Sequence, residues 1–150
     1  MADGLRAWGA ALAGAVLLGM ASVPGVPWTT IGQGDQSGHR EAANVVIRDA
    51  DSWQRLWAQH GTGRLPSPPL PSIDFARDMV IGVFLGERPS GGFAIEVTGV
   101  KRRSDRLVVR VRQTAPDPGA LHTMALTAAH HLVRLPASSL PVVFETRLAP

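Results

Sequence analysis

Residues 74–100 read DFARDMVIGVFLGERPSGGFAIEVTGV, and this stretch decides the fold. The apolar run from Met79 to Leu85 is typical of a buried strand, and it ends at Gly86. After a short polar loop, residues 93–98 alternate between apolar and other side chains, as in a strand with one buried face. The stretch therefore predicts a strand, a tight loop and a second strand, which we expect to pair as a hairpin.

The loop between these two strands is the candidate functional site. Pro89 restricts the backbone, whereas Gly91 and Gly92 permit backbone angles that other residues resist. Loops held by rigid strands often carry binding residues. Two interpretations stay open, because the loop either binds a partner or only turns the chain. If it binds, the expected contact residues are Glu87, Arg88, Pro89, Ser90, Gly91, Gly92 and Phe93.

The rest of the chain predicts one helix and several short strands. Apolar spacing from Trp53 to His60 indicates a helix that Asp49 or Asp51 caps. We expect Trp53 and Trp57, four residues apart, to dock this helix on a sheet; a carbohydrate-binding pair is the alternative. Short turns separate most of the strands, which favours antiparallel pairing. The expected fold is α+β, a predominantly antiparallel sheet of about six strands, curled or sandwich-like, with one packed helix. The remaining strands are expected over 42–48, 107–112, 131–135 and 142–144.

The N-terminus predicts export. Residues 7–18 are almost wholly apolar but too short to span a bilayer, and small residues suit cleavage after Ala21. An uncleaved N-terminal anchor is the alternative. We expect a secreted or periplasmic protein with no membrane span after cleavage. Its expected organisation is a signal peptide over 1–21, a flexible spacer over 22–40 and a single domain over 41–150.

Several kinds of chemistry find no support in the sequence. The chain has no cysteine, which excludes disulfides, thiol nucleophiles and cysteine-ligated metals. Ser90 lies on a turn, but Arg88 occupies the first glycine position of a G-x-S-x-G motif and a strand follows instead of a helix. His130 and His131 are neighbours on a predicted strand and should point to opposite faces, so we expect structural or surface histidines. The sequence thus predicts no enzyme, no metal and no cofactor.

The charge of the chain is basic but modest. The pI is 10.9, yet the net charge is only +3, because 14 of the 15 basic residues are arginines and Lys101 is the only lysine. Aromatic residues make up 5% of the chain, too few for a stacking surface beside the basic cluster. We therefore expect a solvated turn and strand face and no nucleic-acid partner, with an anionic partner as the alternative. The basic residues concerned are Lys101, Arg102, Arg103, Arg106, Arg110 and Arg112.

The segment DFARDMVIGVFLGERPSGGFAIEV resembles the C-terminal domain of the PrcB family, which is described as protease-complex subunits. The resemblance covers roughly residues 73–135 and rests on the strand that ends in Gly86, the loop over 88–93 and the strand after it. Two departures concern hydroxyl groups. Phe93 stands where tyrosine is commoner in the family, and residues 128–130 (AAH) replace the proline and tyrosine expected before a later strand.

The resemblance implies an exported, non-catalytic domain that binds a protein, such as an extracellular protease. The expected function is therefore a protein-binding module that serves as an accessory subunit or partner of a protease. One alternative is a protease inhibitor that uses the loop over 86–93, because this loop is loosely similar to a loop of chagasin-type inhibitors. A carbohydrate-binding domain or a small hydrolase is the third hypothesis.

Overall fold

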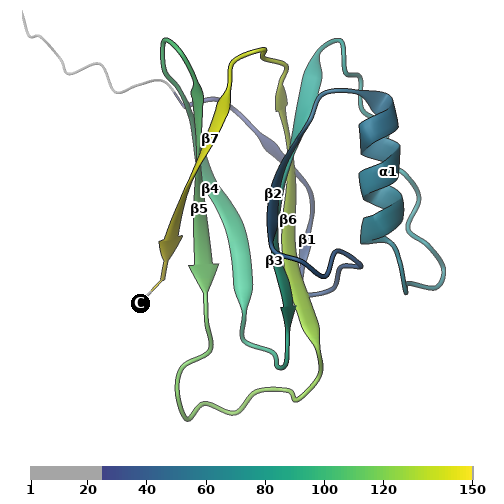
Figure 1. Ribbon diagram of the computed structural model, residues 1–150, viewed down its shortest axis with the longest axis vertical. Helices are drawn as coiled ribbons and strands as arrows, with labels where there is room; N and C mark the ends of the chain where they lie inside the picture. Colours follow the sequence, from purple (N-terminus) through teal and green to yellow (C-terminus); the bar gives the residue numbers. More distant parts are fainter. Residues whose placement is uncertain (1–24, 150) are drawn as a thin grey trace, which may run out of the picture.

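The computed structural model describes residues 25–149, so the expected signal peptide over 1–21 lies outside the described residues. These residues form two β-sheets and one helix (Figure 1). The elements in chain order are β1 (Thr29–Gly34), β2 (Ala43–Ile47), α1 (Ala50–His60), β3 (Asp78–Arg88), β4 (Ala94–Arg102), β5 (Leu107–Thr114), β6 (Thr127–Pro136) and β7 (Val142–Leu148).

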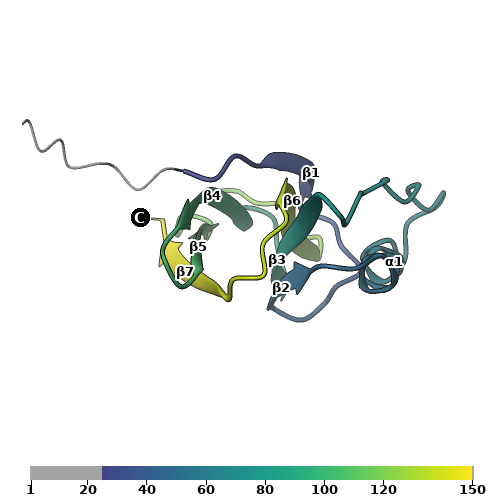
Figure 2. The same cartoon turned by 90° about the horizontal axis from the view of Figure 1, so that it is seen from above.

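The larger sheet has the strand order β1-β6-β3-β2 and is antiparallel throughout. The smaller sheet has the order β4-β5-β7, in which β5 pairs antiparallel with β4 and parallel with β7. The two sheets face each other as a sandwich, and α1 covers the outer face of the larger sheet (Figure 2). The predicted α+β fold, mostly antiparallel sheet with one packed helix, is confirmed.

Strand β3 lies at the centre of the core, because both of its faces are covered. Met79, Ile81 and other odd-numbered residues pack between the two sheets. Val80 and Phe84 point the other way and pack under α1. This double burial explains why the sequence of β3 is continuously apolar instead of alternating.

Helix α1 begins after Asp49, whose carboxylate accepts a hydrogen bond of 2.8 Å from the Ser52 N–H. The side chain of Trp53 is 2% exposed and packs between α1 and the larger sheet, as predicted. Its indole Nε1–H donates to the carbonyl of Pro71, and that of Trp57 donates to the carbonyl of Pro68, both at 3.0 Å. The proline-rich connector therefore covers the tryptophans, and Trp53 lacks the exposure that a carbohydrate-binding pair requires. Within the described range, no helix is long and apolar enough to cross a membrane.

The prediction of a hairpin over 74–100 is wrong. The two strands do form, but β3 pairs with β2 and β6, whereas β4 pairs with β5 in the other sheet. Residues 89–93 are therefore a crossing between two sheets. The alternation of side chains along a strand indicates which face is buried, but it does not indicate which strand is the neighbour.

The predicted flexible spacer over 22–40 is also wrong in its central part. Residues 29–34 form β1, which pairs with β6 along one edge of the larger sheet. Just before it, the Val26 N–H donates a 2.8 Å hydrogen bond to the carbonyl of Val100 in β4. The segment thus contacts both sheets and belongs to the domain.

Candidate functional site

The loop over 86–93 owes its shape to two glycines with positive φ. Gly86 has a φ of 84° and Gly92 a φ of 88°, a region that residues with a side chain rarely adopt. Gly86 also sits at a register shift between β3 and β6, where its backbone closely approaches that of Ala42. Gly92 uses the backbone freedom expected from the sequence, whereas Gly91 has no positive φ, and Gly86 and Gly92 together preorganise the loop.

A second loop, residues 115–126 between β5 and β6, lies against the first. The Gly91 N–H donates to the carbonyl of Thr123 at 2.9 Å, and the Thr127 hydroxyl donates to the carbonyl of Ser90 at 2.8 Å. A Cβ built on Gly91 would lie 2.5 Å from Oγ1 of Thr123, and one on Gly92 would lie 2.7 Å from Cβ of Pro116. Glycine is thus required here for close contact between the loops as well as for backbone angles.

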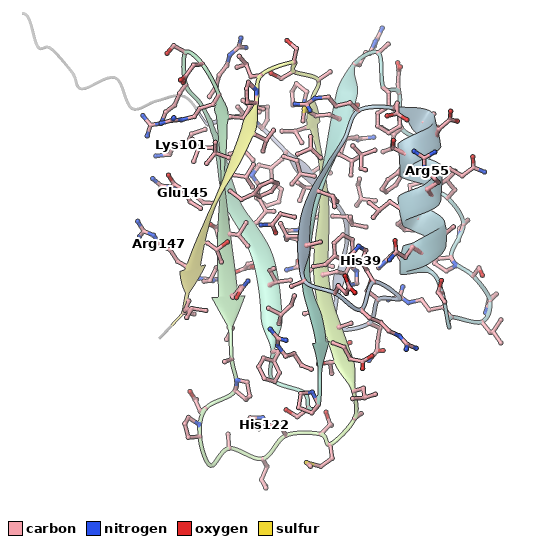
Figure 3. The ribbon with its side chains drawn as sticks, viewed as in Figure 1. His39, Arg55, Lys101, His122, Glu145 and Arg147 are labelled. Atoms are coloured by element: carbon pink, nitrogen blue, oxygen red, sulfur yellow. The ribbon has the colours of Figure 1, made fainter. Side chains whose placement is uncertain are left out.

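The loop over 115–126 is the more prominent of the two, and it extends past the β3–β4 crossing at the same end of the sandwich (Figure 1). Three large apolar side chains on it face solvent: Leu121 is fully exposed, Met124 is 89% exposed and Leu126 is 61% exposed. We call residues 86–93 and 115–126 together the two-loop end. His122 also lies in this second loop (Figure 3).

The predicted contact residues divide between two sides of the two-loop end. Gly91 and Gly92 lie against the second loop, and Ser90 accepts the hydrogen bond from Thr127 at the start of β6. Arg88 instead lies over the ring of Phe93, with its Cζ 5.8 Å from the ring centroid. Glu87 pairs with Arg40, with 3.8 Å between Oε2 and Nε. Phe93 is only partly available, because its ring packs against the core between the sheets.

Sequence reasoning missed the apolar residues of the second loop. The available signal was the length of the connection between β5 and β6, because a loop of twelve residues is long for neighbouring β-strands and such loops are often functional. Leu121, Met124 and Leu126 also lack the alternation of a strand with a buried face. Their grouping with the loop over 86–93 follows only from the pairing of β3 with β6.

The hydroxyl of Ser90 donates to the carbonyl of Gly91 at 3.1 Å, so this side chain bonds the backbone of its own loop. No group of three or more metal-ligating side chains occurs between residues 25 and 149.

The neighbouring histidines of β6 point to opposite faces, as predicted, and both are structural. Nδ1 of His131 accepts a 2.9 Å hydrogen bond from the Val97 N–H of β4, which ties the two sheets together. The neutral ring then carries its proton on Nε2, which donates to the Thr30 hydroxyl at 2.9 Å. Burial lowers the pKa of His131, which favours this neutral form.

On the other face of the sheet, the ring of His130 meets that of His60 edge-on, with 4.4 Å between centroids. Burial lowers the pKa of His130 to about 3 and that of His60 to about 4, and Arg64 adds to both shifts. Nδ1 of His60 forms a 2.8 Å hydrogen bond with the hydroxyl of Ser37. Both imidazoles are therefore neutral packing groups where the end of α1 meets the larger sheet.

The fold and the site define a two-sheet α+β domain that presents paired loops at one end. Residues 79–136 match the family described as PrcB C-terminal, which is the family that the sequence resembles. The match runs from β3 to β6 and includes both loops of the two-loop end. No curated protein and no solved structure matches the chain.

Proposed function

We propose that the protein is an exported, non-catalytic module that binds a partner protein through the two-loop end. The partner class is an extracellular protease, for which the module serves as an accessory subunit. The main observation that supports this proposal is the solvent exposure of Leu121, Met124 and Leu126. Hydrogen bonds hold the chain around these residues against the loop over 86–93.

The exposed apolar side chains of the two-loop end favour binding of a partner protein there. Large apolar side chains in contact with water cost free energy that a partner can recover, at roughly 25 cal/mol per Å² of apolar surface buried. Binding also orders loops, and each ordered side chain costs about 0.5–1.5 kcal/mol. The contacts of Gly91 with Thr123 reduce that cost, because they position the second loop before the partner arrives.

The family match points to the same partner class. A PrcB C-terminal match suggests a protein related to a protease-complex subunit. The apolar N-terminal stretch over 7–18 supports export, which would bring the domain into the compartment of such a protease. The hydrogen-bonded imidazoles of His131 and His60 and the backbone-bonded Ser90 support a module without catalytic groups of its own.

A capture experiment with matched variants tests this proposal. The full chain is immobilised and exposed to the exported proteins of its own source. A double variant, Leu121→Ser with Met124→Ser, should lose capture of the partner by at least about tenfold, because two exposed anchors are removed. Leu65→Ser is the control, since Leu65 is 96% exposed but lies on the connector beside the helix. Equal capture by the double variant and by the control would contradict the proposal.

A peptidase assay separates the accessory-subunit hypothesis from the inhibitor alternative. Paired rigid loops at one end of a sandwich also suit insertion into a protease cleft, so both hypotheses place the partner on the same surface. An inhibitor slows peptide cleavage as the domain is titrated, whereas an accessory subunit leaves cleavage unchanged or faster. Panels of serine, cysteine and metalloproteases serve as enzymes.

A further inference from the structure

The smaller sheet, together with the turn between β4 and β5, concentrates the positive charge of the protein. Residues 94–114 and 142–148 contain seven Lys or Arg against three Asp or Glu, a balance of +4. The remainder of the chain contains eight against nine, a balance of −1. The net positive charge thus belongs to this sheet and its β4–β5 turn, and the sheet lies at the opposite side of the molecule from α1 (Figure 1).

Strand register places like charges beside each other on this face. In the parallel pairing of β5 with β7, Arg112 is the direct neighbour of Arg147, and Arg110 is the neighbour of Glu145. Like charges directly opposite each other in a sheet are destabilising. Arg112 also pairs with Glu96 of β4, so Arg112 lies between this carboxylate and Arg147. Within residues 25–149, the face therefore has one guanidinium group more than its carboxylates can pair.

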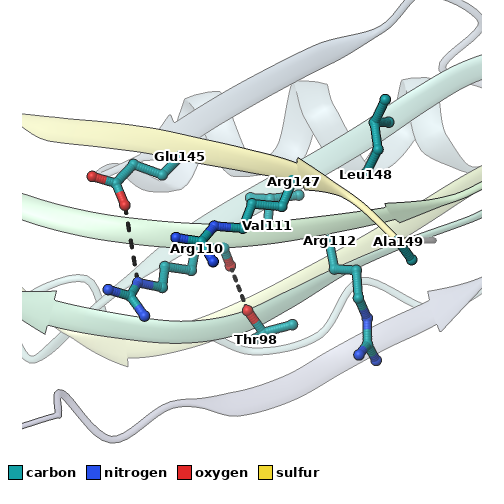
Figure 4. Close-up of a pocket in the computed structure, with 8 residues that line it drawn as sticks. All are labelled: Thr98, Arg110, Val111, Arg112, Glu145, Arg147, Leu148 and Ala149. Atoms are coloured by element: carbon teal, nitrogen blue, oxygen red, sulfur yellow. Dashed lines mark hydrogen bonds and ion pairs between the residues drawn. The ribbon is translucent and has the colours of Figure 1, made fainter.

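A hollow of about 440 Å³ lies over these residues (Figure 4). Thr98 and Arg110 line it on one side, and the end of β7 with Ala149 lines it on the other. Nε of Arg110 is buried beside it without a hydrogen-bond acceptor, since the Glu145 carboxylate is 3.9 Å away. A buried guanidinium N–H without an acceptor costs free energy, which a carboxylate in the hollow would relieve.

We infer that this hollow binds carboxylate side chains of an acidic segment in a partner protein. Arg147 supplies a guanidinium group that pairs with no carboxylate among residues 25–149, Arg110 supplies an N–H without an acceptor, and Thr98 also lines the hollow. Nucleic acid fits less well, because stacking needs aromatic side chains and Phe144, the only aromatic residue of β4, β5 and β7, packs into the core. The surface lies on the smaller sheet and is independent of the proposed function of the two-loop end.

Binding of a labelled glutamate-rich peptide to the full chain tests the inference by fluorescence anisotropy. A glutamine-rich peptide of equal length is the ligand control. The glutamate-rich peptide should bind at about 50 mM salt and weaken at about 500 mM, because salt screens exposed charges. Binding of both peptides alike, or of neither, would overturn the inference.

Three variants locate the site. Arg147→Gln should weaken peptide binding about tenfold, whereas Glu145→Gln should strengthen it, because a competing carboxylate is removed. Arg55→Gln is the matched control, since it changes the net charge equally on the exposed side of α1 (Figure 3). Equal losses for Arg147→Gln and Arg55→Gln would refute a specific site. A single-stranded oligonucleotide that binds as tightly as the peptide, and with the same dependence on Arg147, would assign the face to polyanions in general and overturn the proposed occupant.

Discussion

The buried imidazoles of His60 and His130 predict that the fold loses stability when the pH falls from 7 to 5. Their pKa values in the folded protein are lowered to about 4 and about 3, from 6.5 in an unfolded chain. The unfolded state therefore binds more protons than the folded state at pH 5. By linkage, stability is fully present above pH 6.5 and decreases as the pH falls toward the folded values.

The size of the stability loss follows from how far pH 5 lies below the unfolded pKa of the histidines. At pH 5 each histidine has passed 1.5 pH units below its unfolded pKa, and one unit corresponds to 1.36 kcal/mol, which gives about 2 kcal/mol per histidine. The two rings touch, so we expect about 2–4 kcal/mol for the pair. The lowered pKa of His131 acts in the same direction. Such a loss is a large part of a typical domain stability of about 5–15 kcal/mol.

Urea unfolding at pH 7 and pH 5, followed by tryptophan fluorescence, measures this difference. His130→Gln should reduce the difference between the two pH values by about 2 kcal/mol, whatever it does to stability at pH 7. His122→Gln is the control, because His122 lies in the loop over 115–126, away from α1. The reasoning is refuted if the parent protein is equally stable at both pH values, or if His130→Gln keeps the full difference.

Two further predictions concern packing. Trp53→Ala should lower the unfolding free energy by about 3–5 kcal/mol, because it removes a buried indole and its hydrogen bond to Pro71; in the parent, iodide should leave the emission of Trp53 unquenched, and quenching would contradict its burial. Gly92→Val should cost about 1–3 kcal/mol in urea unfolding, because it forces a β-branched residue to a φ of 88° and against Pro116; an unchanged midpoint would show that the loop adapts.

Local sequence determined most of the elements. Three patterns can be read from a few neighbouring residues and predict their elements directly. They are the apolar run of β3, the helical spacing of Trp53 and Leu56, and the alternation in β5 and β6. The preorganised loop over 86–93 was also predictable, because glycine and proline restrict or free the backbone by themselves. The match to the PrcB C-terminal family rests on the same residues, because it covers 79–136.

Pairing between distant strands was decided only by the tertiary structure. β1 has no apolar pattern, because it is an edge strand with mostly exposed or half-buried residues, so its sequence resembles a spacer. The assignment of β3 and β4 to different sheets depends on contacts with β6 and β5, which are far away along the chain. The two-loop end and the paired arginines of β5 and β7 exist for the same reason. The free energy that selects these pairings comes from burying whole faces of sheets, and no short stretch of sequence contains it.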